Sequence, residues 1–385
     1  MDRIGDDASI VPGPLRRLRL WPQLRPPMTP TPTSTPSAPL RMVAVAGAGD
    51  LDDFIAVPRG IFESDPAWIQ PLSQERRLHL SVRSNPYFQH ARWQAWTAWR
   101  GGKAVGRISA QIDDLHLERY GDATGFFGML DAEDSQDTFA ALFETAERWL
   151  REQGMRRIRG PFNLSINQEM GVLVDGFDTS PFFMMGHARP YYTMHIEKAG
   201  YHKANDALAY MITPDYGSEA IRRLIAATAH RARVRPLDLK RLDAELSLLR
   251  DIFNDAWAGN WGFVPFTDAE FDDLGRAFRF LVDPDMIQIA EVDGEAAAFL
   301  VLLPNINEAI RGLHGRLFPA GWRKLLWRPE SALPRHVPRA ADGRAAQIPA
   351  LEARLCARVS RYRSRAAPDQ TPRRQANRTV LDLRG

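Results

Sequence analysis

Cysteine is nearly absent from this sequence, and so are the usual arrangements of metal ligands. Cys356 is the only cysteine among 385 residues, which excludes a disulfide bond within the chain and fits a reducing compartment. One cysteine cannot build a structural zinc site, and the histidines form no H-E-x-x-H or H-x-x-E-H motif. We therefore expect no metal centre.

Long apolar runs and several catalytic motifs are absent as well. No segment approaches the roughly 20 apolar residues of a transmembrane helix, and the N-terminus lacks the apolar core of a signal peptide. The sequence contains no G-x-S-x-G elbow and no P-loop. We expect a cytoplasmic protein without a transmembrane segment, for which peripheral contact with the inner membrane stays open.

Charge is small overall and unevenly distributed. The net charge is +3 and the pI is about 9.1. Residues 328–385 hold 13 Arg against five Asp or Glu, a net charge of +8, so the remainder is slightly acidic. The high pI is therefore a property of the tail, and we expect no nucleic-acid partner.

Composition divides the chain into four parts. Residues 1–41 hold nine of the 28 prolines and are expected to be disordered, with Met1, Met28 and Met42 as alternative starts. Residues 328–385 have one aromatic residue and no lysine, which indicates either natural disorder or an ending that is out of frame. Between them we expect a first lobe over 42–213 and a second, incomplete lobe over 214–327.

Hydrophobic periodicity indicates an α/β fold in both lobes. The segment 135–154 is expected to form the clearest helix, with Ser135 as its cap and Gly154 as its stop, and hairpins are expected at Gly101-Gly102 and Asp293-Gly294. Further strands are expected over ranges that include 206–212 and 233–239, and helices over 190–200, 218–232 and 243–259. The order strand, helix, hairpin occurs twice, which predicts two related lobes of mixed sheets flanked by helices.

The segment Gly160–Phe177, GPFNLSINQEMGVLVDGF, concentrates small polar side chains behind a strand. Asn163, Ser165 and Asn167 are typical of a turn closed by its own side chains, which is the structural interpretation. The functional interpretation is a pocket floor. Glu169 precedes an apolar run, so partial burial would raise its pKa and make it a general base, with the amides orienting a substrate.

Aromatic residues supply the other candidates. Tyr191, Tyr192 and His195 lie on one expected helix, where Tyr192 and His195 share a face. We expect Asn163, Ser165, Asn167 and Glu169 to line a cleft beside Tyr192. Asn260, Trp261 and Phe263 follow another helix and either line an apolar acyl pocket or cover the second lobe.

Several long segments resemble a known bacterial family. Between Trp93 and Trp327, the segments FFGML, GPFNLSINQEMGVLVDGF, PYYTMHIEKAGY and NWGFVPFT are similar to those of a two-lobed GNAT-like (acyl-CoA N-acyltransferase) family that includes bacterial ceramide synthases. The resemblance implies tandem GNAT-like lobes. It also implies transfer of an acyl group from acyl-CoA, a co-substrate and not a tightly bound cofactor, to an amine such as a sphingoid base. Glu169 would be the base.

The sequence departs from the GNAT pattern where coenzyme A should bind. The family's R/Q-x-x-G-x-G/A loop is replaced by DAEDSQD in the first lobe, Ile196 stands where a tyrosine is common, and the second lobe's loop would fall beyond Trp327. We therefore expect weak acyl-CoA binding by this chain. The alternatives are a non-catalytic or inactive copy and, disfavoured by the lack of an R-E-x-x-E-E helix, a nucleotide pyrophosphohydrolase.

Overall fold

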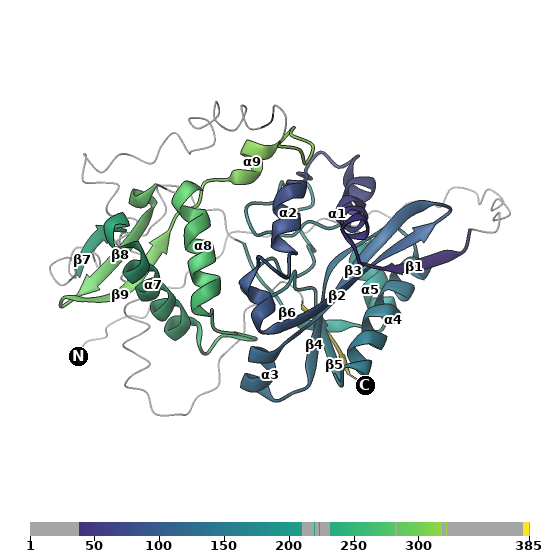
Figure 1. The fold of residues 1–385 in the computed structure, drawn as a ribbon, viewed down its shortest axis with the longest axis horizontal. Helices are drawn as coiled ribbons and strands as arrows, with labels where there is room; N and C mark the ends of the chain where they lie inside the picture. The colour runs from purple at the N-terminus through teal and green to yellow at the C-terminus, as the bar shows by residue number, and fades with distance from the viewer. Residues whose placement is uncertain are drawn as a thin grey trace, which may run out of the picture. The chain divides into compact units, whose positions relative to one another are not determined.

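The computed structural model describes two α/β lobes (Figure 1). It covers residues 38–209, 232–281, 283–317 and 380–384, together with Glu219, Arg223 and Gly321. The first lobe is built on a mixed sheet in the order β1-β2-β3-β4-β5-β10-β6. The strands are β1 (Leu40–Ala44), β2 (Ala91–Arg100), β3 (Lys103–Asp113), β4 (Thr124–Ala132), β5 (Arg157–Gly160), β6 (His202–Asn205) and β10 (Val380–Arg384).

Helices cover both faces of this sheet. They are α1 (Ala48–Phe62), α2 (Ser73–His79), α3 (Asp114–Tyr120), α4 (Gln136–Glu152), α5 (Tyr192–Lys198) and the 3-10 turn η1 (Pro86–Gln89). The predicted helix α4 is confirmed. Ser135 accepts a hydrogen bond from Thr138 N, and the apolar face of α4 packs with Ile108 and Ala110 of β3. Because side chains alternate along a strand, Ser109 and Gln111 point to the opposite face.

The second lobe contains an antiparallel sheet and its own core. The structure gives it β7 (Ala232–Pro236), β8 (Ile287–Val292), β9 (Glu295–Val301), α7 (Leu242–Trp257), α8 (Asp268–Leu281), α9 (Ile306–Ile310), η3 (Leu239–Arg241) and η4 (Pro284–Met286). Leu246, Leu249 and Ile289 are buried between sheet and helices. The predicted fold of two α/β lobes is confirmed, and the hairpin at Asp293-Gly294 forms as expected. None of the described helices has the length and apolarity needed to cross a bilayer.

Three expectations about elements need correction or lie outside the description. The strand expected over 206–212 is wrong for 206–209, where the structure has no strand. Gly200, with φ +92°, follows the end of α5, and the extended backbone begins earlier than expected, as β6 over His202–Asn205. The helix expected over 218–232 falls almost wholly outside the described residues. The tail expected to be disordered or out of frame, residues 328–385, lies outside the described residues except for 380–384, where the backbone of β10 pairs with β5 and β6.

Two glycines allow another segment to cross β4 closely. A Cβ atom at Gly128 would lie 1.8 Å from the carbonyl oxygen of Phe162, and one at Gly160 would lie 2.3 Å from the carbonyl oxygen of Phe127. No side chain fits at such distances, so the glycines of FFGML and RGPF are required by the backbone crossing.

We predict that Gly128→Ala lowers the free energy of unfolding by at least about 3 kcal/mol, because the crossing backbone must move. Gly60→Ala, at an exposed position of α1 with no atom near the new methyl group, should leave stability unchanged or raise it by up to about 1 kcal/mol. Urea denaturation of both variants measures this. Equal stabilities would contradict the close crossing.

Candidate functional site

A cavity of about 370 Å³ lies beside β4. Its walls come from α1, α2, the end of β4, the loop over residues 161–172, the loop over residues 181–188 and the short helix α9. The cavity therefore gathers segments that are far apart in the sequence, including one from the second lobe.

The cavity lining is chemically divided. Five of its charged side chains form two groups of direct contacts: Arg76 lies 2.8 Å from Glu75 and 3.5 Å from Glu169, and Arg107 lies 2.7 Å from Asp131. Much of the remaining lining is apolar and includes Phe62, Trp68, Ile69, Val172, Met184, Met185 and Ile310. Such a division suits a ligand with a polar head and an apolar body.

Asn163 fixes the carboxylate of Glu169 against β4. Its Oδ1 accepts a hydrogen bond from Met129 N at 2.7 Å, and its Nδ2 donates to Glu169 Oε2 at 2.8 Å. Its backbone N also donates to the carbonyl oxygen of Glu169. Met129 has φ +46° where the register between β3 and β4 shifts, so its amide is free to meet the side chain of Asn163.

Two buried side chains hold the start of the same loop. The hydroxyl of Tyr87 donates to Leu164 O at 3.1 Å. Gln111 Nε2 donates to Phe162 O at 2.6 Å and to Leu164 O at 3.2 Å. These bonds satisfy carbonyl groups that would otherwise be buried without partners, so the loop is held rigidly at the site.

The charges at the site reverse one sequence-based expectation. Burial alone would raise the pKa of Glu169, but Arg76 and the hydrogen bond from Asn163 outweigh it, so the pKa of Glu169 is lowered. The prediction of a raised pKa is wrong because the sequence does not show that Arg76 lies opposite. Burial does raise the pKa of Asp131 and the pKa of Glu75. These two carboxyl groups take up a proton more readily than Glu169 does.

Tyr192 joins Glu169 and Asn163 in lining the cavity. Its side chain is buried, and its hydroxyl accepts a hydrogen bond from Ala132 N at 3.0 Å and lies 3.5 Å from Asp131 Oδ1. Burial raises the pKa of Tyr192 well above its usual value, so the phenol stays protonated.

The other two candidates on α5 are placed outside the cavity lining. The hydroxyl of Tyr191 donates to Ala132 O at 2.8 Å, and burial raises the pKa of Tyr191 to about 12. The ring of His195 lies 2.7 Å from both Asp134 and Gln136 and stacks on Phe139. Tyr191, the N-cap residue of α5, is therefore tied to the end of β4, and His195 ties α5 to the start of α4.

The remaining candidates also lie outside the cavity lining, at the contact between the two lobes. Ser165 accepts a hydrogen bond from Asn167 N, and Asn167 Nδ2 donates to Val264 O at 2.9 Å. Trp261 packs edge-on against Phe162, and Phe263 O accepts from the hydroxyl of Tyr120 on α3. Asn260 is exposed and closes the turn before Phe263. The segment NWGFVPFT therefore holds the site loop from the side of lobe two.

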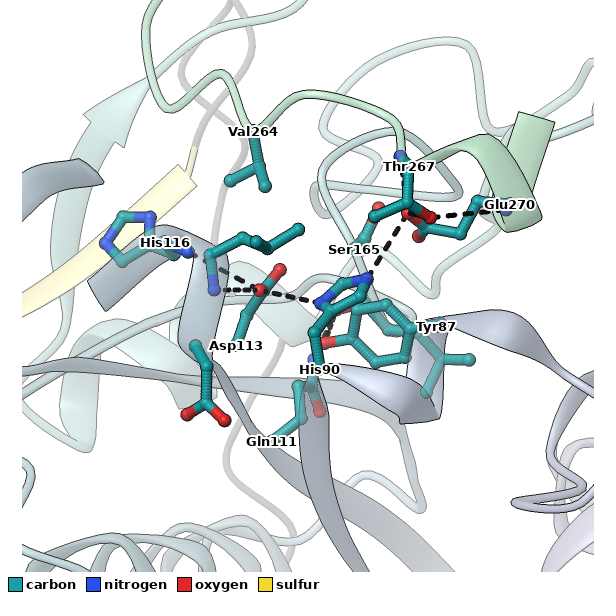
Figure 2. A network of polar contacts seen from close by, with 12 residues as sticks. Tyr87, His90, Gln111, Asp113, His116, Ser165, Val264, Thr267 and Glu270 are labelled. Carbon is teal, nitrogen blue, oxygen red and sulfur yellow. Dashed lines mark hydrogen bonds and ion pairs between the residues drawn. The ribbon is translucent and has the colours of Figure 1, made fainter. Parts of the chain in front are cut away.

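A second polar network joins the lobes through a histidine (Figure 2). His90 Nδ1 lies 3.1 Å from Asp113 Oδ1 on β3, and its Nε2 lies 3.3 Å from Glu270 Oε2 on α8. Glu270 also accepts hydrogen bonds from both the backbone N and the hydroxyl of Thr267. Although burial lowers the pKa of His90, the two carboxylates outweigh it and raise the pKa to about 10.

Sequence reasoning missed the charged partners of Glu169. Asp131 is the next-to-last residue of β4, TGFFGMLDA, whose residues are all buried. An acidic residue in such an apolar strand could have indicated a buried carboxylate at the site. Glu75 and Arg76 lie on a short, highly charged helix, SQERRLH, which is typical of a solvated surface. Only the folded structure brings that helix to the cavity. In the part of the chain that is described, no three His, Cys, Asp or Glu side chains are grouped as metal ligands.

Comparisons with known proteins identify relatives of this chain. No family model matches. The chain is 52% identical over 281 residues to the protein YghO of Escherichia coli (strain K12), which covers 72% of each chain. It is 45% identical over 300 residues to the bacterial ceramide synthase of Caulobacter vibrioides (strain NA1000 / CB15N), covering 77% of this chain and 78% of the relative. A solved tandem GNAT protein from the clavulanic acid biosynthesis pathway has a TM-score of 0.36 and 13% identity, over 68% of this chain and 73% of that chain.

Both relatives match this chain over more than two thirds of their own length. The chain belongs to the family of the bacterial ceramide synthase and YghO. The sequence resemblance stated above is thereby confirmed.

We predict that the bridge at His90 stabilises the fold below neutral pH and loses its effect in alkali. Because the folded-state pKa is raised from 6.5 to about 10, the stabilisation is complete below pH 6.5 and disappears as the pH rises through 10. The free energy of unfolding should therefore fall more steeply between pH 7 and about pH 10 in the wild type than in His90→Gln. His202→Gln, which changes an exposed histidine, should follow the wild type, whereas equal slopes in all three proteins would refute the bridge.

Proposed function

We propose that the chain is an N-acyltransferase that moves an acyl group from acyl-CoA to the amine of a long-chain acceptor, such as a sphingoid base. Membership in the family of a protein named bacterial ceramide synthase supports the reaction class. The observation that carries the proposal is the divided cavity, in which a carboxylate-rich group adjoins an apolar wall.

The polar group suits an ammonium ion. In the lining of the cavity, Glu75 and Glu169 contact Arg76, and Asp131 contacts Arg107. The third guanidinium group of the lining, Arg59, pairs with Glu63 outside it. When these groups are ionised, the three carboxylates together with Arg76 and Arg107 carry one negative charge in excess. A cationic headgroup compensates that charge, and a carboxylate such as Glu169, with its lowered pKa, stays ionised to receive it.

An ammonium ion must lose a proton before the nitrogen can attack. We assign this proton to Asp131, whose pKa is raised by burial and which lies in the same cavity as Glu169. The free amine then attacks the thioester carbonyl, the carbon–sulfur bond breaks, and the leaving thiolate takes the second amine proton. Glu169 holds the headgroup, and Tyr192 holds Asp131 in place.

The apolar wall suits the hydrocarbon part of the acceptor. Trp68 stacks on Phe62 at 5.6 Å, and Ile69 and Ile310 belong to one buried cluster. Met184 and Met185 line the cavity and are also partly exposed, with 36% and 40% of their surface accessible. We propose that this loop makes the peripheral membrane contact through which a lipid amine enters from the inner leaflet.

The donor's pyrophosphate is proposed to bind away from the start of α4. Asp131, Glu133, Asp134 and Asp137 surround that helix start, and several are already paired within the protein: Glu133 with Arg100 and Asp134 with His195. This acidic helix start also favours the alternative function of a non-catalytic family member. Calorimetry with a long-chain acyl-CoA and detection of the amide by mass spectrometry distinguish the two.

We predict different kinetic defects for the two carboxylates. Glu169→Gln should raise the KM for the amine by roughly 10-fold to 100-fold, because a hydrogen bond to a charged group is lost. Asp131→Asn should lower kcat by about 100-fold or more, because the amine keeps its proton. Steady-state transfer from palmitoyl-CoA to sphinganine measures both values.

Glu118→Gln, an exposed carboxylate of α3, is the matched control and should keep wild-type kinetics. Thermal unfolding checks that each variant is folded. Wild-type kcat in folded Asp131→Asn would remove Asp131 from the mechanism. Binding of both substrates by the wild type without any amide product would favour the non-catalytic alternative.

A further inference from the structure

His187 is a lining residue of the cavity that the proposed reaction does not use. Its side chain is only 4% exposed, and its ring packs edge-on against Phe62 with the centroids 5.4 Å apart. It follows the partly exposed loop of Phe182, Met184 and Met185, so the chain turns inward at this residue. A polar ring at this point of an apolar wall needs partners for both of its nitrogens.

One ring nitrogen is firmly held by Asp65. His187 Nε2 lies 2.9 Å from Asp65 Oδ2, which also receives a contact from Arg189 Nη1 at 3.1 Å. The other oxygen of Asp65 accepts from Ala67 N at 3.0 Å. Burial would raise the pKa of Asp65, but His187, Ala67 and Arg189 together lower it, so Asp65 is an ionised acceptor. In the neutral ring the proton is therefore on Nε2.

The other ring nitrogen has no partner. Nδ1 of His187 is buried and makes no hydrogen bond within the described part of the chain. In that neutral form Nδ1 carries a lone pair and accepts a hydrogen bond. An acceptor that is buried without a donor is costly, which points to a donor supplied by a ligand in the cavity.

We propose that the Asp65–His187 pair is a specificity-determining element that accepts a hydrogen bond from a hydroxyl group of the amine acceptor. The inference rests on the proposed function only in taking the cavity as the acceptor site. The ammonium group is assigned to the carboxylates around Arg76 and Arg107, so a second donor on the ligand must be neutral. A hydroxyl group meets that requirement, and a plain alkylamine has none.

The test compares two acceptors that differ in one hydroxyl group. Isothermal titration calorimetry measures binding of 1-amino-2-dodecanol and dodecylamine to the full chain. We expect the wild type to prefer the amino alcohol by about 10-fold, as for one net hydrogen bond. His187→Phe keeps the ring beside Phe62 but removes both nitrogens, so the preference should vanish while dodecylamine affinity changes little.

Further variants and outcomes distinguish a loss of hydroxyl recognition from a folding defect and from a loss of acyl transfer. Asp65→Asn, which no longer fixes the proton on Nε2, should reduce the preference, and His202→Leu at an exposed site should retain it. Equal wild-type binding of the two amines, binding of neither, or an unchanged preference in folded His187→Phe would overturn the inference. A preference in binding without acyl transfer would refute the proposed reaction and leave this inference standing.

Discussion

The candidate site depends on one close crossing of two backbone segments. The loop after β5 passes over β4 so tightly that position 128 has no room for a side chain. The crossing brings Asn163 to the free amide of Met129 and, through Asn163, fixes Glu169 at the cavity. A polar loop at a strand end would otherwise be among the more mobile parts of a protein. Here the buried side chains of Tyr87 and Gln111 donate hydrogen bonds to carbonyl groups of the loop, so the carboxylate of Glu169 has a defined position.

The same loop is also where the two lobes meet. Asn167 donates to the backbone of lobe two, and the bridge from Asp113 through His90 to Glu270 lies nearby (Figure 2). α9, which closes part of the cavity, belongs to lobe two as well. A shift of lobe two would therefore change both the loop that carries Glu169 and the wall of the cavity. This explains why polar residues of the loop that do not line the cavity still matter to its geometry.

Much of the fold was predictable because its signals are local. Capping by Ser135, the two glycine hairpins and the buried face of α4 depend on residues close in sequence, and each was found. The site was only half predictable. Asn163, Ser165, Asn167 and Glu169 were expected in one cleft beside Tyr192; Asn163, Glu169 and Tyr192 line one cavity, whereas Ser165 and Asn167 do not. The pKa of Glu169 is lowered and not raised, because Arg76 comes from a helix far earlier in the sequence. β10 was missed for a similar reason, since its pairing depends on a gap between two distant strands.

Charge balance differs between the start of α4 and the neighbouring cavity. At the start of α4, Glu133 pairs with Arg100 and Asp134 pairs with His195, so these two carboxylates are compensated within the protein. In the cavity the balance is different, because Glu75, Asp131 and Glu169 share Arg76 and Arg107, while Arg59 pairs with Glu63. Burial raises the pKa of Glu75 and the pKa of Asp131. Protonation of one carboxyl group or binding of one cation restores neutrality. In the proposed reaction, such a site can bind the amine as a cation and then transfer the amine's proton to a carboxylate. The nitrogen is left neutral, as attack on the thioester requires.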